Sequence, residues 1–146
     1  MTTATKQTVE TLAQEYCEKI TEANEAWLKK LRLNDDGTFD PWHLDEDGNY
    51  KTDDNPQYFT YMIGRKYLKV VAMEWKDDAQ YGRINAAPAG YQASTVHAFI
   101  DKKTGDVFLP ASWNAPAKGA RFNLFENKEA LFEGVMRRPH GGYLYR

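Results

Sequence analysis

The segment 105–125, GDVFLPASWNAPAKGARFNLF, holds the residues of this sequence that best suit binding chemistry. It places an indole at Trp113 and cations at Lys118 and Arg121, just after a strand-like stretch. Two cations, an indole and the free backbone N–H groups of a helix start would together hold a phosphate and stack a base. The segment therefore predicts a ligand-binding surface. The alternative is that Trp113 plugs the end of a sheet while Lys118 and Arg121 point to water.

A short helical turn is expected within this segment. Ser112 or Asn114 would cap the turn, and Pro116 would lie near its first position, where the missing N–H has no partner to lose. Lys118 and Arg121 are three residues apart in the sequence. A helical turn would therefore place both cations on one face.

A strand predicted over 94–101 adds two ring side chains to this surface. Strict alternation gives the strand two faces, with Thr95, His97 and Phe99 on one and Val96, Ala98 and Ile100 on the other. We expect His97 and Phe99 to lie beside the surface around Trp113. For His97, a partly buried and hydrogen-bonded structural role is favoured over that of a catalytic base.

Sequence signatures of enzymes and metal sites are missing. His43, His97 and His140 are far apart, and none stands in an H-x-x-x-H or H-E-x-x-H arrangement. The Asp-Gly turns do not fit a calcium loop, because setting Gly48 at the sixth position puts His43 at the first. No nucleophile motif and no phosphate-binding glycine loop occurs. We predict no catalytic residue, metal or cofactor, and the question of an enzyme stays open with a lean towards a non-catalytic protein.

The composition indicates one domain with an aromatic-rich core. The chain has 146 residues, of which 14% are aromatic, and a formal net charge of -2. That charge removes the simple argument for nucleic-acid binding from a strongly basic chain. Its single cysteine, Cys17, forbids an intramolecular disulfide and a zinc site of several thiolates. With no signal peptide and no apolar run of about 20 residues, we expect a soluble, intracellular protein without membrane contact.

Hydrophobic periodicity predicts an α+β fold. Apolar residues at i, i+3 and i+4 spacing indicate a long amphipathic helix that packs on a four-stranded antiparallel meander, with a short C-terminal helix. The expected divisions of a single domain, 1–146, are the helix 9–33, an acidic irregular segment 34–56, the sheet 57–110, and a basic segment 111–146 with short helices, one over 128–136, and a tail. The acidic segment is long for a loop in a compact domain, so we expect it to be partly mobile or functional.

Two stretches carry a resemblance to a known group. VHAFIDKKTGDVFLPASWNAPAKGARFNLF (96–125) and the final GGYLYR (141–146) resemble small uncharacterised proteins of tailed bacteriophages, particularly of marine and cyanobacterial phages. The shared marks are the P-A-S-W-x-A-P-A-K-x-x-R segment and the C-terminal Y-L-Y, and no activity is known for the group. The resemblance implies expression in the host cytoplasm during infection or, alternatively, packaging into the virion.

Two functions compete on these observations. The first is a small phage accessory protein that binds a nucleotide-type ligand, nucleic acid or a host protein through Trp113, Lys118 and Arg121, with His97 and Phe99 adjacent. The alternative is a structural or assembly protein of the virion, in which the long helix and the aromatic surface make contacts within a homo-oligomer. An enzyme acting on nucleic acid is a third hypothesis, and it would need carboxylates or histidines clustered at the same surface.

Overall fold

A computed structural model of the chain describes residues 2–75 and 90–145, with side chains described from Val9 onward. The elements in order are α1 (Thr2–Arg32), η1 (Pro41–His43), β1 (Tyr58–Ile63), β2 (Tyr67–Trp75), β3 (Tyr91–Asp101), β4 (Asp106–Phe108), β5 (Phe122–Asn123), α2 (Lys128–Arg137) and η2 (Gly142–Leu144). The strands form one antiparallel sheet in the order β1-β2-β3-β4-β5. The α+β class is confirmed, and the predicted four strands are corrected to five.

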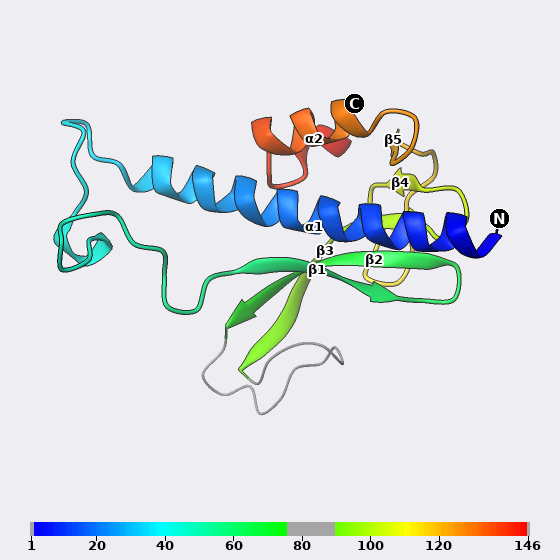
Figure 1. Cartoon of the computed structure of the whole chain (residues 1–146), viewed down its shortest axis with the longest axis horizontal. Helices are drawn as coiled ribbons and strands as arrows, with labels where there is room; N and C mark the ends of the chain where they lie inside the picture. The colour runs from blue at the N-terminus through cyan, green and yellow to red at the C-terminus, as the bar shows by residue number, and fades with distance from the viewer. Residues whose placement is uncertain (1, 76–89, 146) are drawn as a thin grey trace.

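Helix α1 forms because its apolar residues recur on one face. The buried members of this stripe are Val9, Ala13, Tyr16, Cys17, Ile20 and Ala23. They pack against the sheet and α2, and each large side chain buried here stabilises the fold by about 1.5–3 kcal/mol. Figure 1 shows α1 running along the sheet with α2 beside it. The helix begins at Thr2, which is earlier than the sequence predicts, and ends at Arg32.

The two faces of the sheet have different neighbours. The face that packs against α1 and α2 is called here the helix-side face, and its buried strand residues are Phe59, Leu68, Val70, Ala72, Ala98, Ile100 and Val107. The opposite side is called the outer face. It holds a second buried cluster of Val71, Met73 and Tyr91. Alternation along the strands therefore gives this sheet two apolar faces.

A β-bulge at His97 changes which residues share a face. Val70 pairs with Ala98 whereas Val71 pairs with Val96, so His97 is an extra residue on β3. The bulge turns His97 to the helix-side face together with Ala98, while Phe99 and Val96 lie on the outer face. The predicted grouping of His97 with Phe99 is therefore wrong. Strict alternation fails here because β3 inserts an unpaired residue, and a second register shift follows between Ala72 and Met73.

Residues 34–56 form a lobe at the C-terminal end of α1, which we call the acidic lobe (Figure 1). Two turns shape it, each closed on a glycine, and both Gly37 and Gly48 have φ +84. Arg32 ties the lobe to α1, because its guanidinium donates to both carboxylate oxygens of Asp53 and to the Tyr50 hydroxyl. The lobe is irregular, as predicted, and contacts of its own side chains fix it to the helix.

Candidate functional site

Aromatic and basic side chains gather on the outer face where β2, β3 and β4 lie side by side. The ring of Tyr67 stands edge-on to Phe99 and Phe108, with centroids 5.9 Å apart in both pairs. Lys66 lies over the Tyr67 ring at 5.4 Å. We define the aromatic–basic face as Lys66, Tyr67, Lys69, Phe99, Phe108, Trp113 and Arg121.

Lys69 contacts the rings of both Trp113 and Phe99 on this face. Its Nζ lies 4.6 Å from the centroid of Trp113 and 5.9 Å from that of Phe99. Burial lowers the pKa of Lys69, because removal of water disfavours the charged form. Among the described residues, Lys69 forms no ion pair with a carboxylate. Its ammonium is therefore held by rings alone and has donor capacity left for an anion.

Trp113 stands at the tip of an extended loop, and the predicted helical turn is wrong. Pro110 and Pro116 form an isolated antiparallel bridge, and the N–H of Ala117 donates to the Leu109 carbonyl at 2.7 Å. The chain therefore folds back beside the end of β4 instead of winding into a helix. The indole of Trp113 is 42% exposed. It does not plug the end of the sheet, which was the alternative to a binding role.

Arg121 joins this face through strand register. Its N–H donates to the Val107 carbonyl at 2.7 Å, and the next residue, Phe122, pairs with Val107. Because Phe122 packs against Tyr143 on the helix-side face, alternation turns Arg121 to the outer face beside Phe108.

Lys118 and His97 are the two predicted site residues that the structure does not bring to Trp113. His97 lies on the helix-side face. Lys118 is exposed on the stretch between the Pro116 bridge and β5. No interaction joins it to Trp113 within the described part of the chain. The structure therefore brings Trp113, Phe99 and Arg121 to one face, and it adds Lys69, which the sequence did not single out.

His97 belongs to a buried hydrogen-bonded chain on the helix-side face. Its Nε2 lies 2.6 Å from the Tyr143 hydroxyl, which lies 2.5 Å from the Tyr16 hydroxyl. Burial lowers the pKa of His97 to about 4 and raises the pKa of both tyrosines. All three groups are therefore neutral near pH 7, which suits a structural network and not a base poised for catalysis. The sequence analysis did not single out Tyr143, which lies in the C-terminal GGYLYR stretch.

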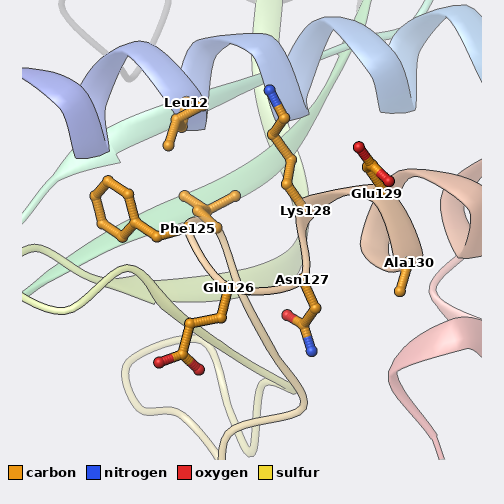
Figure 2. A pocket seen from close by; sticks show the side chains of 8 residues that line it. Leu12, Phe125, Glu126, Asn127, Lys128, Glu129 and Ala130 are labelled. Atoms are coloured by element: carbon orange, nitrogen blue, oxygen red, sulfur yellow. The ribbon is translucent and has the colours of Figure 1, made fainter.

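A hollow of about 520 Å³ at the start of α2 offers less chemistry (Figure 2). In the close view, Lys128 extends toward α1, while Glu126 and Asn127 point away from it. Lys128 pairs with Glu15 of α1 at 3.2 Å, so its charge is used inside the protein. The two carboxylates of Glu126 and Glu129 at this hollow disfavour an anion.

Within the described residues, we looked for side chains that could bind a metal ion and for helices that could span a membrane. No group of three His, Cys, Asp or Glu side chains within residues 2–75 and 90–145 is placed to hold a metal ion. Cys17 is buried, and burial raises the pKa of its thiol. None of the helices in the described part of the chain has the length and apolar character needed to cross a membrane.

The fold and this surface define an α+β protein with an aromatic and basic sheet face opposite its helices. A family model described as a family of unknown function (DUF7717) matches residues 1–146, so the chain belongs to this family. Neither the curated proteins nor the solved structures contain a match to the chain. Function is therefore argued from the geometry of the site.

Proposed function

We propose that this protein binds single-stranded nucleic acid through the aromatic–basic face. The observation that carries the proposal is the pair formed by Trp113, 42% exposed, and the Lys69 ammonium 4.6 Å from its ring. Proteins that bind single strands combine aromatic rings for stacking with cations along the backbone path. Trp113 supplies an aromatic ring and Lys69 supplies a cation, and the two lie in contact on the outer face.

The rings and cations act on different parts of the strand. A base stacked on Trp113 contributes about 1–3 kcal/mol, and it does so for any base because each has a π-face. The Lys69 ammonium is partly desolvated, which lowers its pKa, and its remaining donors can take a backbone phosphate. Lys66, whose ammonium lies 5.4 Å from the centroid of the Tyr67 ring, extends the cationic path along the aromatic rings.

Charges elsewhere in the molecule favour this face for a polyanion. Asp101, at the end of β3, accepts hydrogen bonds from the backbone N–H groups of Lys103 and Thr104, so its carboxylate is occupied in the turn. The β1–β2 turn, which carries Lys66, lies near the N-terminal end of α1, whereas the acidic lobe lies at its C-terminal end (Figure 1). The acidic lobe repels a strand and the aromatic–basic face attracts it, which orients the encounter.

Two exposed tryptophans provide a matched test. The binding of a fluorescein-labelled oligothymidylate is measured by fluorescence anisotropy for the wild type, Trp113→Ala and Trp42→Ala. Trp42 is 70% exposed and lies in the acidic lobe. We expect Trp113→Ala to weaken binding by about 1–3 kcal/mol and Trp42→Ala to leave it unchanged. Absence of binding by the wild type, or equal losses in the two variants, would contradict the proposal.

A further inference from the structure

A second hollow lies on the helix side of the sheet, separate from the aromatic–basic face. It has a volume of about 350 Å³ and is bounded by the last turn of α2 and the C-terminal segment. The residues that matter at this C-terminal pocket are Arg137, Arg138, Gly142, Tyr143 and Tyr145. A volume in this range suits a small organic ligand.

The pocket carries two guanidinium groups and one carboxylate. Arg138 forms no side-chain ion pair within the described residues. Arg137 donates from Nη2 to Oε1 of Glu133 at 2.6 Å, and both side chains of this pair are about 70% exposed. An exposed pair of this kind contributes little and exchanges readily, so Arg137 is available to a stronger anion. The pocket therefore favours an anionic ligand.

Two glycines set the shape of the pocket. A Cβ built on Gly142 would lie 3.0 Å from Cδ of Arg138, so the aliphatic part of Arg138 passes directly over the Gly142 backbone. A Cβ on Gly134 would lie 2.8 Å from Cβ of Tyr143, which shows how closely α2 and the C-terminal segment approach. The missing side chains let Arg138 and the tyrosines converge on the same space.

We propose that the C-terminal pocket binds a free nucleoside monophosphate. Arg138 and Arg137 take the phosphate, because the planar guanidinium donates two parallel hydrogen bonds to such oxygens. Tyr145, which is 68% exposed, offers its ring to the base. This site goes beyond the proposed function, since it shares no residue with the aromatic–basic face and needs no strand of nucleic acid.

Isothermal titration with adenosine 5′-monophosphate tests the proposal, with adenosine and inorganic phosphate as separate probes. We expect the monophosphate to bind more tightly than either fragment. Arg138→Gln should weaken it by about ten-fold or more, as loss of a charge-assisted hydrogen bond implies. Glu133→Gln should tighten it by up to about five-fold, because it frees Arg137. Lys103→Gln, an exposed cation on the β3–β4 turn, is the matched control and should leave the affinity unchanged.

Gly142→Ala tests the positioning of Arg138 without removing a charge. The added methyl group must displace the Arg138 side chain, so affinity should fall while the thermal unfolding midpoint stays near that of the wild type. The proposal is overturned if the wild type gives no heat with the monophosphate, or if Glu133→Gln and Arg138→Gln both leave its affinity unchanged. Weakening by Lys69→Gln with no effect of Arg138→Gln would place the ligand on the aromatic–basic face and would also overturn the proposal.

Discussion

The two faces of the sheet differ in how their polar side chains are partnered and exposed. On the helix-side face, His97 is 8% exposed and its ring nitrogen is satisfied by Tyr143. On the outer face, Trp113 is 42% exposed and Lys69 contacts rings alone. A closed hydrogen-bond network specifies one packed structure, whereas a cation held against rings keeps donors for a partner.

His97 and Phe99 show how little sequence distance separates these environments. They are two residues apart on β3, yet one is turned to the buried network and the other lies beneath Lys69. A single unpaired residue produces this difference. Residue type alone therefore does not predict the role of a residue in this sheet. Three experiments test the contrast between its faces, and a fourth compares them with the acidic lobe.

The largest effect is expected at Tyr143. Replacement by Ala should lower the free energy of unfolding by about 3–5 kcal/mol, since it removes a large ring packed against the core and leaves two polar groups without a partner. Tyr143→Phe removes only the hydroxyl and should cost about 1–3 kcal/mol. Urea unfolding measures both. Tyr145→Phe makes the same change at an exposed neighbour and should cost less than about 0.5 kcal/mol, so equal effects of the two Phe variants would refute the buried network.

The next effect is a pH dependence from His97. Its folded-state pKa of about 4 lies below the ordinary value of 6.5, so the unfolded chain binds more protons between these two pH values. Stability is complete above about pH 6.5 and is lost as the pH falls toward 4, by about 3 kcal/mol at most. Urea unfolding at about pH 7 and about pH 4.5 compares the wild type with His97→Gln, which should depend less on pH. An identical pH dependence in both proteins would mean that His97 does not titrate as its burial implies.

On the outer face, Lys69→Gln should change binding and its salt dependence. Each phosphate contact on a single strand adds about 0.7 to the slope of log affinity against log salt concentration. Loss of Lys69 should therefore lower that slope by about 0.7, measured by anisotropy between about 50 and 200 mM salt. Lys103→Gln removes an equal charge away from the rings, and its slope should match that of the wild type. A shared decrease would show that net charge, and not the face, controls binding.

The smallest effect is expected at the acidic lobe, outside both faces. Asp53→Asn removes the carboxylate charge from the ion pair with Arg32, which is made at 2.9 Å with Asp53 half exposed. Such a pair contributes about 0.2–1 kcal/mol to the free energy of unfolding. Urea unfolding at low and high salt measures it, because screening should reduce the difference. A loss as large as that of Tyr143→Phe would place the lobe among the core elements.

Elements defined by local pattern could be predicted from the sequence. The helix expected over 9–33 is present as the larger part of α1, because its spacing is a property of consecutive turns. The strand predicted over 94–101 lies within β3, and the short helix predicted over 128–136 lies within α2. These elements could be predicted because the pattern that defines each of them lies within one short stretch of the chain.

Features set by distant contacts could not be predicted. The bulge at His97 depends on the register between β2 and β3, and the residue types around it do not predict a bulge. The two residues of β5 are too few for a period, and they are a strand only because β4 lies beside them. The sequence predicts Pro116 near the first position of a helical turn, whereas it lies opposite Pro110 in an antiparallel bridge. For the site, Trp113 could be singled out from the sequence. Its neighbour Lys69 could not, because Lys69 lies on β2, far away along the chain.

The hydrogen bond between Tyr16 and Tyr143 joins residues 127 positions apart. It can therefore form only after almost the whole chain has been synthesised. On the ribosome, α1 emerges before the strands and α2 that cover its apolar stripe. The core becomes complete only when Tyr143 has left the exit tunnel, and contacts of such long range are slow to form. A nascent chain stalled before the final segment would therefore leave Tyr16 without its hydrogen-bond partner and the core without Tyr143 and Leu144, so we expect it to be cleaved by proteases more readily than the finished protein.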